Sequence, residues 1–417
     1  MRSRPIAERP SHVGFLKGIF PHVVVLATML ALLGACAPRP QGLMRPVVAA
    51  EATEEGRSVD LLVATNRQVV ADPDVRYGNR RDPHLHLTAV SVAMPKGRPE
   101  GTVQWPRTTP PQPQTDFHVT RLQTLTTVAQ GRGWMRQHRR GGHVLLFVHG
   151  YNTTYGEAVY RFAQITADSG VEAAPVLFTW PSSGSLLGYN YDRESTLFSR
   201  TALEQTLRLL ANDPSINQIT ILAHSMGSFL AMEALRQMSI RSGPLNPKIQ
   251  NVILASPDID IQVFARQFTE IVGPRPRFTI FVAQDDRALL LSRLIAGRVD
   301  RVGDINPAEE PYVSGLARAG IVAIDLTRID DTGGSHHSRF ADSPEIVQII
   351  GRRLAEGQQL TTTDIERGGF VMVAAGALHT VGAVVTAPVA VLEAGSRPVP
   401  DISGTLAADP DALRTER

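Results

Sequence analysis

From residue 143 onwards, short runs of apolar residues alternate with segments in which apolar residues recur every three or four positions. Because the short runs are apolar throughout, they predict strands that are buried on both faces. The predicted strands are 143–150, 174–182, 218–225, 249–258, 277–286 and 320–326, and the predicted helices are 155–170, 193–213, 227–240, 263–272, 288–297 and 343–357. This alternation indicates a parallel sheet covered by helices on both sides.

Two further apolar runs, 58–67 and 85–95, precede the alternating region and predict two more strands. The stretch 106–113 is rich in proline and therefore predicts an irregular surface segment. No internal repeat of fixed period is present, which excludes a solenoid. We predict one α/β domain at 57–357, with a mostly parallel sheet of about eight strands and helices on both faces.

The N-terminal residues have the pattern of an export signal. Four basic residues (Arg2, Arg4, Arg9 and Lys17) precede the apolar run 23–35, which is short for a membrane span. The run ends in Leu-Gly-Ala-Cys, which resembles a bacterial lipobox, where the cysteine is lipidated. We therefore predict a signal peptide at 1–35 and a lipid-anchored tether at 36–56, with a signal anchor and a chance cysteine at Cys36 as the alternative. Ala37 favours the outer membrane over the inner one in a Gram-negative source.

The C-terminal region, 358–417, has a different composition from the domain. The stretch 368–392 contains no Asp, Glu, Lys or Arg and is long enough to cross a bilayer. It is rich in Ala and Gly and is interrupted by His379 and Pro388. We therefore favour a peripheral segment that packs on the domain or lies at the membrane surface, with a second membrane span as the alternative. The residues after it have a composition typical of disorder.

Charge and cysteine content exclude several classes of function. The chain has 42 Lys and Arg against 40 Asp and Glu, without a basic stripe interleaved with aromatic residues, so we expect no nucleic-acid partner. Cys36 is the only cysteine, which excludes a disulfide framework. No set of residues has the spacing of metal ligands, and we expect no metal and no other cofactor. The sequence does not determine the oligomeric state.

Ser225 is the candidate nucleophile. It lies where the apolar strand 219–223 must turn into the helix that begins near Gly227. In such a strand–turn–helix only small residues fit two positions before and after the serine, and Ala223 and Gly227 fill those places. The turn raises the hydroxyl above the sheet, and the helix directs its positive end at the same point. The alternative is a structural serine that caps the helix.

A nucleophilic serine also requires two backbone N–H groups that bind the oxyanion. One is expected from Met226, the residue after the nucleophile. The other is expected from the turn after an earlier strand, where the His-Gly pair at 149–150 lets the backbone bend closely and makes Tyr151 the donor.

Several segments occur together in an order that resembles a known superfamily. They are FVHGYN (147–152), LFTWPSSG (177–184), AHSMG (223–227) and DDRAL (285–289). The combination looks like a bacterial, esterase- or lipase-like branch of the alpha/beta-hydrolase superfamily, of unknown substrate, and extends over about residues 58–355. The resemblance implies the alpha/beta-hydrolase fold and a triad in the chain order serine, acid, histidine.

That order puts the catalytic base after the last strand. The glycine-rich stretch 333–344 contains His336 and His337, and a histidine there can swing over the sheet to take the serine proton. The spacing of HSRF to the following helix resembles the family pattern and favours His337, with His336 as the alternative.

The acid is expected at the end of the strand before, which finishes in Asp285 and Asp286. The resemblance favours Asp286, and Asp285 would then be hydrogen-bonded in the turn. Asp258 or Asp260, one strand earlier, is the rival, because some members of the superfamily take their acid from there.

These residues predict a serine hydrolase that cleaves carboxylic esters, lipid esters included, at the bacterial cell envelope, where a lipid anchor holds it to the membrane. A non-catalytic envelope scaffold with the same fold is the first alternative, because a fold alone does not prove activity. A thioesterase or peptidase with the same triad is the second.

Overall fold

A twelve-stranded sheet forms the centre of the computed structural model, which describes residues 39–47, 56–295, 297, 299–329, 337–351, 371–374, 377–380 and 383–384. The strands are β1 (Ser58–Val69), β2 (Tyr77–Ala93), β3 (His118–Leu125), β4 (His143–Val148), β5 (Ala174–Thr179), β6 (Gln218–His224), β7 (Ile249–Ala255), β8 (Arg277–Val282), β9 (Val322–Asp325), β10 (Val371–Ala374), β11 (Ala377–Thr380) and β12 (Ala383–Val384). Seven of them run parallel, in the order β9-β8-β7-β6-β4-β5-β1. The others extend the two edges antiparallel.

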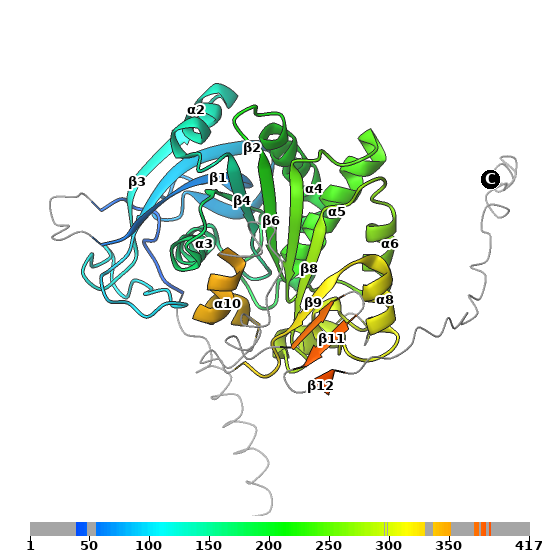
Figure 1. The fold of residues 1–417 in the computed structure, drawn as a ribbon. Coiled ribbons are helices and arrows are strands. Elements are labelled where there is room, and N and C mark those ends of the chain that lie inside the picture. The colour runs from blue at the N-terminus through cyan, green and yellow to red at the C-terminus, as the bar shows by residue number, and fades with distance from the viewer. Residues whose placement is uncertain are drawn as a thin grey trace, which may run out of the picture.

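Helices cover both faces of this sheet (Figure 1). They are α2 (Val128–His138), α3 (Tyr155–Ser169), α4 (Tyr189–Ala211), α5 (Met226–Ser242), α6 (Ile261–Thr269), α7 (Arg287–Ile295), η2 (Val302–Asp304), α8 (Tyr312–Ala319), α9 (Arg339–Asp342) and α10 (Pro344–Ile349). The pair α3 and α10 packs on one face, and α4 packs against α5 on the other. Alternate residues of β4 enter the two cores: Val144 and Leu146 face one hydrophobic cluster, Leu145 and Phe147 the other. The predicted α/β fold class is confirmed.

One helix, α3, begins and ends where the sequence predicts, and another, α10, begins where the sequence predicts but ends at Ile349 instead of 357. Thr154 and Glu157 form a capping box at the start of α3, and Gly170 ends that helix with φ 61°. Ser343 caps α10, and Pro344 occupies its first turn, where a missing N–H costs nothing.

The sheet contains four strands more than predicted. β3 was missed because most of its residues are half-exposed or exposed, so it lacks a continuous apolar run. The helices α2 and α8 were missed for a similar reason, since only three and one of their residues, respectively, are buried. β10 pairs antiparallel with β9, so part of the predicted hydrophobic segment 368–392 adds to the edge of the sheet.

The described part of the predicted tether lies on the domain. Leu43 and Met44 are 4% and 1% exposed, and the Tyr160 hydroxyl donates to the Leu43 carbonyl at 2.8 Å. The Val47 N–H donates to the Val119 carbonyl at 2.9 Å. We name residues 39–47 the N-terminal segment. The predicted signal peptide and Cys36 lie outside the described residues.

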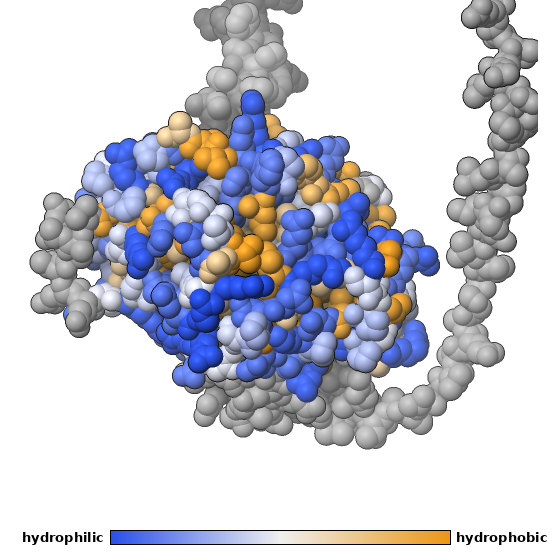
Figure 2. Space-filling view, turned by 90° about the horizontal axis from the view of Figure 1, so that it is seen from above, coloured by the Kyte–Doolittle hydropathy of each residue, from blue (hydrophilic) through white to orange (hydrophobic). Residues whose placement is uncertain are grey.

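The surface at the α2 end of the molecule is mostly polar, with apolar side chains in small separate groups (Figure 2). Within the described ranges, no helix has both the length and the apolar character that a membrane crossing requires.

Candidate active site

Ser225 occupies the sharp turn between β6 and α5. Its backbone has φ 53° and ψ −125°, which is an unfavourable conformation for a residue other than glycine. The main chain fixes the turn: the Ser225 N–H donates to the Ala255 carbonyl at 2.9 Å, and the Ser225 carbonyl accepts from the Asp258 N–H at 3.2 Å. A strained serine between a buried strand and a helix has the backbone geometry of a nucleophile elbow.

Two glycines allow the turn after β4 to touch this elbow. A Cβ atom on Gly227 would lie 2.2 Å from the carbonyl oxygen of His149 and 2.7 Å from that of Val148. A Cβ atom on Gly150 would lie 2.8 Å from the Cβ of Ser225. Backbone therefore meets backbone at this contact, and neither glycine can carry a side chain without displacing its neighbours.

His337 and Asp286 form a hydrogen-bonded pair. Nδ1 of His337 lies 2.7 Å from Oδ2 of Asp286, whose side chain is completely buried. The other carboxylate oxygen accepts from the N–H groups of Ala288 and Leu289 at 3.0 and 3.1 Å, at the start of α7. Because the backbone holds one oxygen, the other is directed at the imidazole, which keeps its proton on Nδ1 and leaves Nε2 as the proton acceptor. His336 lies outside the described residues.

The pairing also sets the charge state of His337. Burial alone would lower the pKa of His337, but the charge of Asp286 and the hydrogen bond to it outweigh burial, and the pKa is raised above its usual 6.5. The ring of His224, the residue before the elbow, lies 4.7 Å from the ring of His337. Burial and then the charge of His337 hold the pKa of His224 well below 6.5. A neutral His224 donates from Nε2 to the His337 carbonyl at 3.2 Å, which brings the His337 loop next to Ser225.

The other candidate acids have other partners. Asp285 is bound through both oxygens to the guanidinium of Arg339, at 2.5 and 2.7 Å. This ion pair replaces the predicted hydrogen bond within the turn. Asp258 is buried and pairs with Arg301 at 3.3 Å, while Asp260 caps α6 through its side chain. Of these four aspartates, Asp286 is the one that pairs with His337 in the described part of the chain.

The two predicted oxyanion donors lie on either side of the contact between the elbow and the turn after β4. Met226 is the first residue of α5, so its N–H has no acceptor within the helix. Tyr151 follows Gly150, whose backbone touches Ser225. In the described part of the chain, neither N–H group donates a hydrogen bond. Two such donors beside a nucleophile can bind a developing oxyanion.

Arg67, near the end of β1, supports this turn, a role that was not predicted from the sequence. Its side chain is 1% exposed and donates to the Thr153 carbonyl at 2.7 Å and to the Thr179 hydroxyl at 2.9 Å. Burial lowers the pKa of Arg67 to about 10, so it remains charged at neutral pH. Burial and the charge of Arg67 lower the pKa of His149 to about 3, and neutral His149 accepts from the Trp180 N–H at 3.1 Å.

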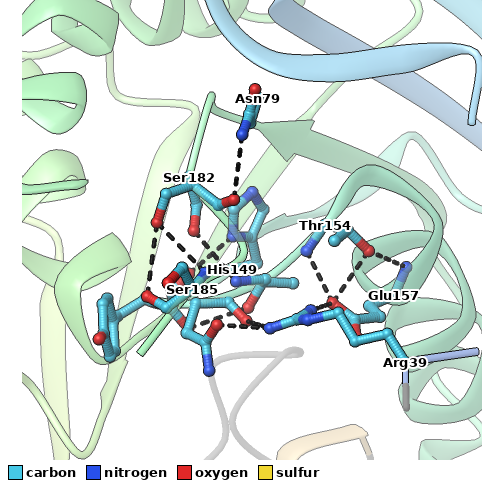
Figure 3. Close-up of polar contacts among 12 residues, drawn as sticks. Arg39, Asn79, His149, Thr154, Glu157, Ser182 and Ser185 are labelled. Atoms are coloured by element: carbon cyan, nitrogen blue, oxygen red, sulfur yellow. Dashed lines mark hydrogen bonds and ion pairs between the residues drawn. The ribbon is translucent and has the colours of Figure 1, made fainter. Parts of the chain in front are cut away.

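Asp192, in the first turn of α4, holds the same region from another side. Its buried carboxylate accepts from the Asn152 N–H at 3.1 Å, the Ser182 hydroxyl at 2.6 Å and the Ser183 N–H at 2.5 Å. Ser182 lies beside His149 in the close-up (Figure 3). We name residues 149–154 the oxyanion loop. Its main chain is fixed by buried charges rather than by packing alone.

A cavity of about 2060 Å³ opens beside these groups. Gly150, Tyr151 and His337 contribute to its wall, and so does Trp105, from the connection between β2 and β3. Leu187, which is 97% exposed, lies at its surface. The cavity can admit a substrate much larger than the ester group itself. No cluster of three or more His, Cys, Asp or Glu suited to a metal ion occurs in the described ranges.

Parts of the chain are similar in sequence to known proteins. The model of a family described as "Alpha/beta hydrolase of unknown function (DUF900)" matches residues 129–353, which is more than half of the chain. An uncharacterized protein of Nostoc sp. is 29% identical over 138 residues, a match that covers 26% of this chain and 36% of that protein. The match thus spans about a third of that relative's length.

Two solved esterase structures are also similar. An esterase of Pyrobaculum calidifontis matches with a TM-score of 0.32 and 10% identity, over 65% of this chain and 81% of that one. An esterase of the fungus Rhizomucor miehei matches with a TM-score of 0.32 and 12% identity, over 73% of this chain and 86% of that one.

Proposed function

We propose that this chain, which belongs to the alpha/beta-hydrolase family of unknown function DUF900, is a serine hydrolase that cleaves carboxylic esters. The observation that carries the proposal is the 2.7 Å hydrogen bond between His337 and the buried Asp286, on the loop that packs against the strained turn at Ser225. A nucleophile, a base and an acid in this chain order are the elements of acyl transfer through a covalent intermediate.

The proposed reaction proceeds in two halves. Nε2 of His337 takes the proton of the Ser225 hydroxyl as its oxygen attacks the ester carbonyl, and the Met226 and Tyr151 N–H groups bind the oxyanion. The intermediate collapses to an acyl-enzyme, and the alcohol leaves with the proton from His337. Water then attacks the acyl group, His337 removes its proton, and the acid and free Ser225 are released. Asp286 stabilises the imidazolium in both halves.

Labelling with a fluorophosphonate tests this proposal without knowledge of the natural substrate. The wild-type protein should be labelled and should hydrolyse p-nitrophenyl esters, and Ser225→Ala should do neither. Ser228→Ala is the matched control, because Ser228 lies one turn further along α5 and its hydroxyl donates to the Ala223 carbonyl. A folded wild-type protein that takes no label would refute the proposal and favour the scaffold alternative.

We also propose that the protein is exported and lipidated on Cys36, and that the outer membrane is its location in a Gram-negative cell. The basic leader, the apolar run and the lipobox-like Leu-Gly-Ala-Cys support this. Metabolic labelling with an alkyne fatty acid should mark the wild-type protein in the membrane fraction and leave Cys36→Ser unmarked. Equal labelling of both proteins would contradict the assignment.

A further inference from the structure

We propose that Arg39 is a positioning residue for the oxyanion loop, so that the N-terminal segment forms part of the active site; this inference rests on the proposed function. The guanidinium of Arg39 donates to both oxygens of Asn152, the backbone carbonyl at 3.1 Å and the side-chain Oδ1. It also forms an ion pair with Glu157. Arg39 extends towards Glu157 and Thr154 in the close-up (Figure 3).

Asn152 is the residue at which Arg39 acts on the loop. Its φ is 58°, in the left-handed region that asparagine adopts more readily than most residues other than glycine. Asp192 accepts from its N–H, and Arg39 donates to its carbonyl, so the residue is held at both ends. Tyr151, the proposed oxyanion donor, lies between this fixed residue and Gly150, which rests against the elbow. The orientation of the Tyr151 peptide therefore depends on both anchors.

Glu157 fixes the direction from which Arg39 approaches. Its carboxylate accepts from the Thr154 N–H at 2.8 Å and from the Thr154 hydroxyl at 2.9 Å, as part of the capping box of α3. A carboxylate held in this way offers one oxygen to Arg39 in a constant place. The planar guanidinium can then reach Glu157 and both oxygens of Asn152 together, which an ammonium group cannot.

This contact should matter more for the reaction than for stability. The Arg39 side chain is 36% exposed, and ion pairs at such positions contribute little to the free energy of unfolding. A displacement of a catalytic group by ~1 Å, in contrast, can slow a reaction about 100-fold. Arg39 also lines the same cavity as Tyr151 and His337, so its replacement changes the wall of the candidate active site directly.

Variants of the full chain test the inference. Arg39→Ala should lower kcat on a p-nitrophenyl ester about 10-fold, with KM changed less than about 2-fold, because the loss concerns the transition state. The second-order rate of fluorophosphonate labelling should fall by a similar factor, since that reaction uses the same oxyanion donors. Arg39→Lys should keep the pair with Glu157 and the melting temperature, yet lose most of the same activity.

Arg45→Ala is the matched control. Arg45 lies in the same N-terminal segment and pairs with Asp74 at 2.6 Å, away from the oxyanion loop, so its loss should leave kcat and labelling unchanged. If the wild type is labelled and Arg39→Ala keeps the same kcat and labelling rate, the inference about Arg39 is overturned while the proposed function stands. An equal loss of activity in Arg45→Ala and Arg39→Ala would also overturn it, because the segment would then act through general stability. A wild type without labelling would refute the proposed function instead.

Discussion

Replacing Asp286 with asparagine tests the proposed triad at the position where several aspartates compete. Asparagine caps a helix as well as aspartate does, so its oxygen can keep the bonds that Oδ1 of Asp286 accepts from Ala288 and Leu289. Its amide nitrogen would then face Nδ1 of His337, where the carboxylate lies at 2.7 Å. Two donors cannot share a hydrogen bond, so the imidazole must move its proton to Nε2 and can no longer accept one from Ser225.

The expected loss in kcat is about 10³- to 10⁴-fold, which is the size of effect seen when a triad histidine takes the wrong tautomer. This corresponds to about 4–5.5 kcal/mol of transition-state stabilisation. The free energy of unfolding should change by less than about 1 kcal/mol, because the cap remains. The assay is hydrolysis of p-nitrophenyl esters, with stability followed by urea denaturation of the same preparations.

Two control variants separate the role of Asp286 from that of its neighbours. Asp285→Asn removes the charge of the exposed carboxylate that pairs with Arg339. Because His337 keeps its own partner, kcat should stay within about 3-fold of wild type. Asp258→Asn leaves Arg301 buried without its opposite charge and should destabilise the fold by about 3 kcal/mol, while the folded fraction remains active. Full activity of Asp286→Asn, together with inactive Asp258→Asn, would refute the assignment and move the acid to β7.

The remaining predictions concern pH and backbone support. Because the pKa of His337 is raised by Asp286 and the reaction needs the neutral imidazole, kcat/KM should increase with pH through a pKa above 6.5. In Asp286→Asn the residual activity should increase with pH through a lower pKa than in the wild type. The same pKa in both pH profiles would contradict this. Gly227→Ala puts a methyl group 2.2 Å from the His149 carbonyl oxygen, so denaturation should show a loss of about 3 kcal/mol or more, and an unchanged midpoint would be inconsistent with the close contact. Arg67→Met leaves buried carbonyl groups without donors, so the free energy of unfolding should fall by at least about 2 kcal/mol and kcat should also fall. Urea denaturation and hydrolysis of p-nitrophenyl esters measure the two effects.

The core of the fold was predictable because the parallel strands are buried on both faces. The nearly continuous apolar runs of β4 and β6 indicate that environment directly. The antiparallel strands β2 and β3 mix exposed and buried positions, so their lengths and even the presence of β3 depend on partners that lie far away in the chain. Pairing of β10 with β9 is likewise a tertiary event that local composition does not encode.

The candidate site likewise contains residues that were predictable from the sequence and residues that were not. Ser225, Asp286 and His337 follow strand ends, and chain order alone brings such positions to one edge of a parallel sheet. Arg67 and Arg39 have no comparable signal. Each donates to a main-chain carbonyl group of a loop that is distant in the chain. Because every residue has such a carbonyl group, the sequence does not indicate which of them accepts the bond.

The contact of Arg39 with Asn152 also limits where the proposed enzyme can work. Only two residues lie between Cys36 and Arg39, and the three residue-to-residue steps that join them reach at most about 11 Å when fully extended. With acyl chains on Cys36, as proposed above, the mouth of the cavity would be confined to the headgroup layer of the membrane and could not swing into the surrounding solution. Esters that diffuse within that layer would then form a two-dimensional pool of substrates, sampled by lateral collision.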